Sequence, residues 1–448
     1  MGTTQISSNL SKKRFVVSIY GLGNVGGPLA AAWLRTGVKI IGVDISKKLL
    51  SEIKCGTSHK KEPFISQTFT TALKKGKLTL TSKGINASKK TDIKIIAVPV
   101  GIKQNKIDLS ALISASTDVA KGLKKKDVVI ICPSLPPGTT RNLVLPILEK
   151  FSHLKRKRDF YLIYNPERIF EGRALEDIEK NYPAIVSGLD KKSLELGERL
   201  LKMISKKGVL KMSSLENAET EKIFEGVYRD VNIALANELA EFCEKLGVDY
   251  WEARKGANSQ PFCHLHYPGT GVGGLCIPVY PQFVIKSALK IGKRMKIIEF
   301  SRKTNDFMPK KCVNDALELL KKNKIKFKDS KIAVLGLGFR GEVADSRLSP
   351  TYTVVTEFLK KGFDVAVHDP YIFQDKNLPV KVSLSKELKT VVKDASLIFI
   401  STDHKMYAQL NKKLLDGANK PLLIFDGRNI LNKKNFKNST VLSIGTRL

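Results

Sequence analysis

Short apolar runs alternate with helix-like segments through the first half of the chain. The runs are rich in β-branched residues, and the segments between them carry apolar residues at helical spacing. This alternation predicts a parallel, doubly wound sheet, in which ligands lie beyond the carboxyl ends of the strands. The predicted strands are 14–20, 38–43, 93–98, 128–132 and 161–164, with helices at 109–122 and 139–150.

A single long helix is predicted at 213–247. Ser213 and Ser214 suit its N-cap, and apolar residues recur at helical spacing as far as Phe242. At 1.5 Å per residue such a helix spans roughly 50 Å, which exceeds the width of a small domain. We therefore expect it to pair with its own copy in a homodimer. One face of this helix carries Glu219, Lys222, Gly226, Arg229 and Ile233.

The strand–helix alternation restarts after a charged linker at 321–328. Helix-like segments precede the linker, and a strand that ends in Gly336 and Gly338 follows it. The segment Phe339-Arg340-Gly341 is expected to break the helix-packing pattern of these glycines, so the second sheet need not bind a dinucleotide. The helix-like segments are 275–290 and 296–320, and the later strands are 364–367, 397–400 and 422–425.

Length and composition indicate several folded domains. The chain has 448 residues, and 42% are hydrophobic, which is enough for packed cores. No apolar run approaches the roughly 20 residues that cross a bilayer, and the N-terminus lacks the apolar segment of a secretory signal. The six cysteines are sparse and scattered, which favours a reducing cytoplasm. Cys263, His264 and His266 match no metal-binding motif, so no metal is expected.

The net charge of +34 favours contact with anions in general. The lysines are spread along the whole chain, and the densest run, at 155–158, is expected to be a solvated connection. The sequence contains no basic patch interleaved with aromatic residues and no recognised nucleic-acid-binding module. Neither nucleic acid nor a membrane is therefore expected as a partner.

The first predicted strand leads into GxGxxG at the start of a helix. Its first two glycines allow a tight turn and the approach of a pyrophosphate, and the third lets helix and strand pack closely. The second strand ends in Asp44, which suits the ribose 2′-hydroxyl of NAD and repels the 2′-phosphate of NADP. We therefore predict NAD as the cofactor, bound by Gly21, Gly23, Asn24, Val25, Gly26, Asp44, Val98, Pro99 and Ser134.

A glycine-rich stretch at 268–283, PGTGVGGLCIPVYPQF, contains Cys276. Its glycines permit the backbone to wrap closely around a ligand. The cysteine is a candidate nucleophile where its surroundings favour the thiolate. The alternative is an ordinary buried cysteine after a turn, because free cysteine is among the most buried residue types.

A series of motifs follows in one order along nearly the whole chain: GLGNVGGPLA, Asp44, PSLPPGTT, NPERIFEGRALED, AETEK, GTGVGGLCIP, GFRGEVADSRLSP, HDP, TDH and DGRN. Together they resemble one family, the UDP-sugar 6-dehydrogenases. NPERIFEGRALED and RDVNIALANELA resemble the UDP-N-acetylmannosamine branch more than the UDP-glucose branch. The resemblance implies an enzyme of nucleotide-sugar metabolism that serves polysaccharide or glycan biosynthesis.

The resemblance implies a four-electron, NAD-dependent oxidation of C6 of the UDP-sugar. Cys276 would add to the aldehyde to give a thiohemiacetal, and a second oxidation would leave a thioester that water releases. Lys222 would stabilise the negatively charged oxygen, Glu167 would take part in general acid–base catalysis, and Ser134 would orient water. The implied substrate-binding residues are Glu167, Arg168, Lys222, Arg229, Gly271, Gly273, Arg340 and Arg428.

Several positions differ from the family pattern. Tyr280 stands where many relatives have aspartate, Gly226 where many have asparagine, Leu275 where histidine is frequent, and Arg340 where lysine is frequent. Loss of one oxyanion-hole donor typically lowers the rate by about 10²–10³. A non-catalytic nucleotide-sugar-binding relative is therefore one alternative. Others are a UDP-glucose or another UDP-N-acetylhexosamine 6-dehydrogenase, and a two-electron dehydrogenase that would not need Cys276.

The expected fold class is α/β, with two Rossmann-like doubly wound domains joined by a long central helix. We expect a polar leader at 1–12 and an NAD-binding domain at 13–208. A central dimerisation domain with the cysteine loop is expected at 209–320, and a UDP-sugar-binding domain at 321–448.

Overall fold

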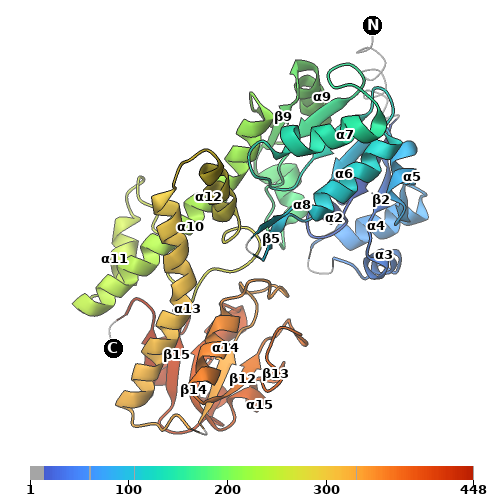
Figure 1. Ribbon diagram of the computed structural model, residues 1–448. Helices are drawn as coiled ribbons and strands as arrows, with labels where there is room; N and C mark the ends of the chain where they lie inside the picture. The colour runs from blue at the N-terminus through green and yellow to red at the C-terminus, as the bar shows by residue number, and fades with distance from the viewer. Residues whose placement is uncertain (1–14, 60–61, 105, 329, 447–448) are drawn as a thin grey trace. The chain divides into compact units, whose positions relative to one another are not determined.

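The computed structural model describes residues 15–59, 62–104, 106–328 and 330–446. The expected polar leader at 1–12 lies outside these ranges. The chain divides into two compact units, one ending at Phe224 and the other beginning at Glu225 (Figure 1). The described helices include none that combines the length and apolarity needed to cross a membrane.

In the described part of the first unit, eight strands form one sheet in the order β10-β9-β8-β7-β4-β1-β2-β3. All neighbours are parallel except β8 and β9. The strands are β1 (Val16–Tyr20), β2 (Lys39–Val43), β3 (Leu78–Thr81), β4 (Ile93–Ile96), β7 (Val128–Ile131), β8 (Tyr161–Tyr164), β9 (Ala184–Gly188) and β10 (Val209–Lys211). A separate hairpin pairs β5 (Gly101–Lys103) with β6 (Lys106–Asp108).

Helices cover both faces of this sheet and bury a core on each face. Ile19 and Ile130 pack into one core with Trp33, whereas their sequence neighbours Tyr20 and Ile131 belong to the other. This division follows from the two-residue period of a strand. The helices are α2 (Gly26–Arg35), α3 (Lys47–Lys54), α4 (Ile65–Lys74), α5 (Gly84–Lys89), α6 (Ser110–Gly122), α7 (Leu145–Ser152), α8 (Ala174–Glu176) and α9 (Lys191–Leu201), with π-helical turns at Thr140–Val144 and Asp177–Asn181.

The second unit contains a parallel sheet of six strands within its described residues, in the order β13-β12-β11-β14-β15-β16. Its strands are β11 (Lys331–Leu335), β12 (Asp364–His368), β13 (Ser383–Ser385), β14 (Ala395–Ile400), β15 (Leu423–Asp426) and β16 (Thr440–Ser443). Its helices are α11 (Tyr250–Ala257), α12 (Tyr280–Lys290), α13 (Lys296–Lys322), α14 (Thr351–Lys360), α15 (Leu388–Val392) and α16 (Lys405–Ala408), with 3₁₀ turns at Lys412–Leu415 and Lys433–Phe436.

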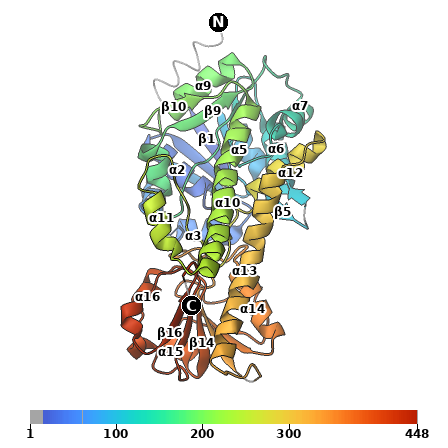
Figure 2. The ribbon, with the colours of Figure 1, turned by 90° about the vertical axis from the view of Figure 1, so that its left-hand side faces the viewer.

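The long helix α10 (Leu215–Leu246) begins in the first unit and continues into the second as one element (Figure 2). In the second unit it packs against α13 through buried polar pairs. Asp230 accepts from Arg302 and, at 2.8 Å, from the Asn305 amide, while Asn237 donates to Asn305 at 2.9 Å. Such pairs fix the register of two helices more strictly than apolar contacts alone.

The α/β fold class with two Rossmann-like sheets and a long central helix is confirmed, whereas the expected domain boundaries stay a prediction. One local expectation was wrong. The helix expected from residue 275 begins at Tyr280, because Cys276–Val279 form a turn in which the Val279 amide donates to the Cys276 carbonyl. The helix expected at 139–150 is present, with the π-helical turn Thr140–Val144 leading directly into α7.

Candidate active site

The GLGNVG turn of the first unit has the geometry of a nucleotide cradle. Gly21 has φ +85°, and a Cβ on it would lie 2.8 Å from the Ala97 carbonyl oxygen, next to Val98. A Cβ on Gly26 would lie 1.8 Å from the Gly21 carbonyl oxygen, so this position must stay glycine for α2 to pack. Nothing lies within 4 Å of the corresponding point at Gly23, which leaves the turn open to a ligand.

Asp44 holds this turn from the end of β2. Its Oδ2 accepts from the Leu22 amide and its Oδ1 from the Ser46 amide, both at 2.8 Å. Each carboxylate oxygen has a second lone pair, so Asp44 can still accept ribose hydroxyls. The glycine cradle, the start of α2 and Asp44 therefore fit NAD, which, when bound, supplies the oxidising equivalents.

His59 is a further residue of this turn that the sequence analysis missed. Its Nε2 lies 2.9 Å from the Leu22 carbonyl oxygen and 3.3 Å from that of Gly23. A Cβ on Gly27 would lie 2.3 Å from the same nitrogen, so the glycine makes room for the imidazole. No motif links His59 to the turn, and only the GG doublet at Gly26 and Gly27 hinted at a close neighbour.

Glu167 and Lys222, predicted from separate motifs, lie together in the first unit. The Lys222 ammonium is 3.8 Å from Glu167 Oε1, and only 8% and 14% of these side chains are exposed. Glu167 Oε2 accepts from the Ile169 amide at 3.1 Å, and the Glu167 amide donates to the Cys132 carbonyl at 3.2 Å. The carboxylate is thus held beyond β7 and β8, beside a cation that can stabilise negative charge.

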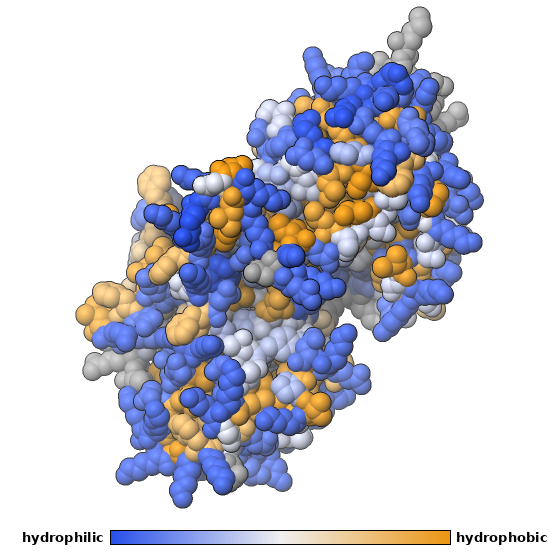
Figure 3. Space-filling view, viewed as in Figure 1, coloured by the Kyte–Doolittle hydropathy of each residue, from blue (hydrophilic) through white to orange (hydrophobic). Residues whose placement is uncertain are grey.

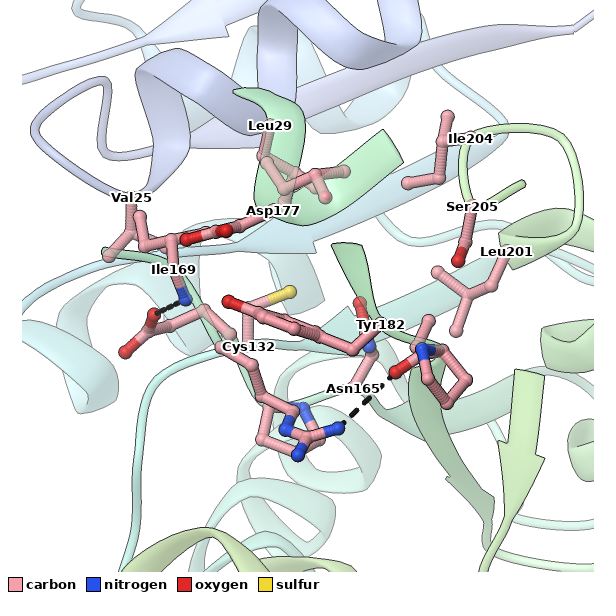
Figure 4. Close-up of a pocket in the computed structure, with 16 residues that line it drawn as sticks. Val25, Leu29, Cys132, Asn165, Ile169, Asp177, Tyr182, Leu201, Ile204 and Ser205 are labelled. Atoms are coloured by element: carbon pink, nitrogen blue, oxygen red, sulfur yellow. Dashed lines mark hydrogen bonds between the residues drawn. The ribbon is translucent and has the colours of Figure 1, made fainter. Parts of the chain in front are cut away.

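Arg168 and Glu167 are among the residues that line a small pocket, whose labelled walls in Figure 4 include Cys132 and Tyr182. The Arg168 guanidinium donates to the Pro183 carbonyl at 3.3 Å, lies over the Tyr182 ring and reaches within 3.9 Å of Glu221. The pocket has a volume of about 50 Å³, far below the roughly 300 Å³ of a ligand site. These contacts hold Arg168 against its neighbours in the first unit, and its predicted part in substrate binding stays a prediction.

Glu219 anchors the loop that carries Ser134. Its fully buried carboxylate accepts from the Gly138 amide at 2.5 Å and from the Thr140 amide at 2.8 Å. Burial raises the pKa of Glu219 to about 7, although the two amides oppose this change. Ser134 itself is buried, with 8% exposed. Glu219 shares the helix face predicted to carry Lys222, but its role as a loop anchor was not predicted.

Cys276 is exposed, whereas the thiols of Cys132 and Cys312 are buried. Burial raises the pKa of both buried thiols far above the usual range, so neither can form a thiolate readily. The sequence left open whether Cys276 is a nucleophile or an ordinary buried cysteine, and its exposure removes the second alternative.

The glycines before Cys276 lie against loops of the second sheet. Gly271 has φ +145°, and a Cβ on it would lie 3.0 Å from Pro350. A Cβ on Gly273 would lie 2.5 Å from the Leu348 carbonyl oxygen. The Gly274 amide donates to the Arg347 carbonyl at 3.0 Å. The loop is therefore built as one piece with the segment at 339–350, which contains Arg340.

Arg428 lies at the other end of the same loop. A Cβ on Gly269 would be 2.6 Å from its Nη1, and its Nε donates to the Ser401 carbonyl at 2.8 Å. Burial by itself would raise the pKa of Asp403. The nearby Arg428 cation and the hydrogen bond from the Gly341 amide have the larger effect and hold the pKa of this carboxyl below its usual range. The predicted residues Gly271, Gly273, Arg340 and Arg428 thus belong to loops that meet around the cysteine segment.

Arg229 is an exposed residue of α10, and its charge acts on His266, which lies just before the cysteine loop. Burial, together with the Arg229 and Arg254 cations, lowers the pKa of His266. Lys222 and Cys276 belong to different units, so their meeting stays a prediction, as do the predicted roles of all the site residues. Within the described residues, no group of three or more His, Cys, Asp or Glu side chains is placed to hold a metal ion.

The second sheet repeats the turn of the first but fills it with protein groups. Gly336 has φ +98°, and its amide donates to the His368 carbonyl, as the Gly21 amide donates to Val43. Asp369 stands in the place of Asp44, and its fully buried carboxylate accepts four amides, from Leu337, Gly338, Tyr371 and Ile372. This carboxylate is enclosed, so the second sheet lacks a ribose acceptor of the NAD type.

Comparison with known proteins covers most of the chain. Three family models match, all of the UDP-glucose/GDP-mannose dehydrogenase family. They are the NAD binding domain at residues 15–205, the central domain at 216–307 and the UDP binding domain at 333–433.

Comparison with individual relatives indicates the same family. The UDP-N-acetyl-D-mannosamine dehydrogenase of Pyrococcus horikoshii is 32% identical over 93% of this chain and 96% of its own length. The solved structure of UDP-D-ManNAc dehydrogenase from that organism matches with a TM-score of 0.88 over 96% of this chain and 99% of its own. An NDP-N-acetyl-D-galactosaminuronic acid dehydrogenase of Methanosarcina mazei Go1 matches at 30% identity and a TM-score of 0.82, over 98% and 97% of the two chains. The chain belongs to the UDP-glucose/GDP-mannose dehydrogenase family and is an NAD-dependent UDP-sugar dehydrogenase.

Proposed function

We propose that this enzyme oxidises C6 of UDP-N-acetylmannosamine to the uronate in two steps, each consuming one NAD. The observation that carries the four-electron reaction is the exposed Cys276, held by a loop whose glycines are packed against Pro350 and the Leu348 carbonyl. A rigid, accessible thiol suits covalent retention of an aldehyde between two oxidations. The acetamido sugar is supported by the name of the relative from Pyrococcus horikoshii.

The chain's own groups have distinct roles in this mechanism. The Cys276 sulfur adds to the C6 aldehyde, the second oxidation converts the thiohemiacetal to a thioester, and water replaces sulfur to give the acid and the free thiol. Lys222 stabilises the C6 oxygen while it is negatively charged. Glu167, 3.8 Å from Lys222, takes the proton of the attacking water, which Ser134 orients.

Initial rates of NADH formation with UDP-N-acetylmannosamine, UDP-N-acetylglucosamine and UDP-glucose test the substrate. We expect kcat/KM for the mannosamine derivative to exceed both others by at least tenfold. Higher activity with UDP-glucose would contradict the assignment. Tight binding of all three sugars with no NADH formed would identify a non-catalytic relative.

We also propose that the enzyme is a homodimer that uses α10, and that it works in the cytoplasm, as its sparse, scattered cysteines suggest. A groove in the second unit is lined by Val231, Leu235, Ile297 and Phe300. Leu235 is 45%, Ile297 72% and Phe300 62% exposed, and apolar residues reach the surface over α12 and the start of α13 (Figure 3). Exposed apolar side chains gathered in this way are typical of protein–protein interfaces.

Size-exclusion chromatography with light scattering, which measures the mass of the eluting protein, tests the proposed dimer. We expect twice the chain mass for the wild type, and the monomer mass after Phe300→Glu and Leu235→Glu. A wild-type monomer at working concentration would contradict the proposal.

A further inference from the structure

Most strands of the large sheet in the first unit have exposed lysines at or shortly before their first residue. The pattern recurs at five strands that are far apart in sequence. The cations are Lys39 at the first position of β2, Lys74, Lys75 and Lys77 before β3, Lys89 and Lys90 before β4, Lys124, Lys125 and Lys126 before β7, and Lys155, Arg156, Lys157 and Arg158 before β8; all are exposed.

The topology brings these segments to a single edge. Strands β8, β7, β4, β1, β2 and β3 are parallel neighbours, so their N-terminal ends line up. At about 4.8 Å between strands, the edge is roughly 24 Å long. Two contacts confirm that adjacent segments meet, since Lys77 Nζ donates to the Gly37 carbonyl and the Lys126 amide to that of Asp159. The glycine turn and Asp44 lie at the opposite edge.

The fold itself accounts for only part of this charge. Helices of a doubly wound sheet end at the same edge, and a cation in the last turn offsets the helix dipole. Arg35, Lys74, Lys89, Lys121 and Lys150 occupy such positions. The remaining lysines have no such role. The buried Asp127 is engaged by the buried Lys94, and the other acids of this edge, Asp92 and Asp159, are far fewer than its exposed cations.

The kind of cation favours a diffuse anionic surface. The two arginines, which recognise phosphates bidentately, are held in ion pairs, Arg156 with Glu149 and Arg158 with Asp159. What remains are lysines, which act as flexible point charges. Phe151 at the end of α7 is 37% exposed beneath the Lys121 and Lys150 ammonium groups, as in an interfacial anchor. A single aromatic ring provides no platform for successive bases.

We propose that this lysine edge docks the enzyme on an anionic lipid surface, with the cofactor edge of the same sheet facing away from the bilayer. The expectation that no membrane acts as partner is thereby revised to a peripheral, charge-driven contact. Each lysine close to an anionic bilayer contributes roughly fivefold to partitioning.

Sedimentation with vesicles tests this proposal. The full-length protein is mixed, at about 0.1 M salt, with vesicles of phosphatidylcholine containing about one-third phosphatidylglycerol, or of phosphatidylcholine alone. The test variant is Lys75→Gln, Lys125→Gln and Lys157→Gln together. The matched control is Lys180→Gln, Lys206→Gln and Lys207→Gln, which removes the same charge from exposed positions of the same unit. NADH formation in solution and thermal unfolding verify that both variants are folded.

We expect the wild type and the control to sediment with the anionic vesicles only, and the test variant to bind them at least tenfold more weakly with unchanged solution activity. Equal losses in both variants would attribute binding to net charge and overturn the proposal. Equal binding to both vesicle types would also overturn it. So would displacement from the vesicles by an equimolar single-stranded oligonucleotide at about 0.15 M salt, because the edge would then be a nucleic-acid site.

Discussion

Gly226 and Tyr280, two positions where this chain departs from its family, are in contact. A Cβ on Gly226 would lie 2.4 Å from Tyr280 Cδ2 and 3.2 Å from its Cβ and Cγ. Carbon atoms in contact are normally about 3.5–4.0 Å apart, so Gly226→Ala must displace the ring by about 1 Å. The ring is 6% exposed and has Phe283 beside it, which leaves it little space.

The displacement should reach the nucleophile. Tyr280 is the first residue of α12, and its amide donates to the Cys276 carbonyl at 3.0 Å. Overpacking destabilises the fold by roughly 1–3 kcal/mol. The higher helix propensity of alanine offsets about 1 kcal/mol of this relative to glycine. We therefore expect Gly226→Ala to lower the free energy of unfolding by at most about 2 kcal/mol. A shift of the thiol by about 1 Å should lower kcat by about 100-fold.

A double-mutant cycle measured by urea unfolding and NADH kinetics isolates the contact. In a Tyr280→Ala background the ring is gone and only the Cβ of residue 280 remains, 3.2 Å away, so Gly226→Ala should lose most of its cost and change the free energy of unfolding by less than about 1 kcal/mol. Gly256→Ala in α11, where nothing lies within 4 Å, is the matched control and should stabilise in either background. If Gly226→Ala had the same effect with and without the Tyr280 ring, the argument from contact would be refuted.

Three further predictions concern the first unit. Asp44→Asn should raise KM for NAD at least tenfold and reduce the preference for NAD over NADP. The reason is that the substitution removes one oxygen of the carboxylate that accepts from the Leu22 and Ser46 amides. Initial rates with both cofactors measure this change. Lys222→Met should lower kcat by about 10²–10³ and leave NADH binding, followed by fluorescence, unchanged; an unchanged kcat would exclude Lys222 from the reaction. Burial raises the pKa of Glu219 to about 7, whereas in the unfolded chain the carboxyl has its ordinary pKa of 4.5. Between these two pH values the folded protein keeps a proton that the unfolded chain releases. Stability should therefore fall by about 3 kcal/mol as the pH rises from 4.5 to 7, and urea unfolding should find a flatter profile for Glu219→Gln.

The sequence predicted those parts of the site that are encoded by local patterns. GxGxxG and Asp44 are fixed by backbone geometry, so their spacing suffices to predict both the turn and its ligand. Lys222 and Glu167 were predicted from resemblance, and the structure brings them within 3.8 Å.

Contacts between distant segments could not be predicted in this way. The fit of Tyr280 over Gly226 depends on how α12 meets α10, and His59 reaches the glycine turn from a loop with no motif. The lysine edge was missed for the same reason. Its members are scattered in sequence and become neighbours only through the strand order, although lysine pairs immediately before strands were a visible signal.

The ratio of NADH formed to UDP-N-acetylmannosamine consumed tests the central claim most directly. The account predicts two NADH per sugar and a uronate product for the wild type, and no uronate from Cys276→Ala, with Cys55→Ala, another exposed cysteine, behaving as the wild type. A ratio of one with released aldehyde, or a Cys276→Ala enzyme that still forms two NADH per sugar, would contradict it.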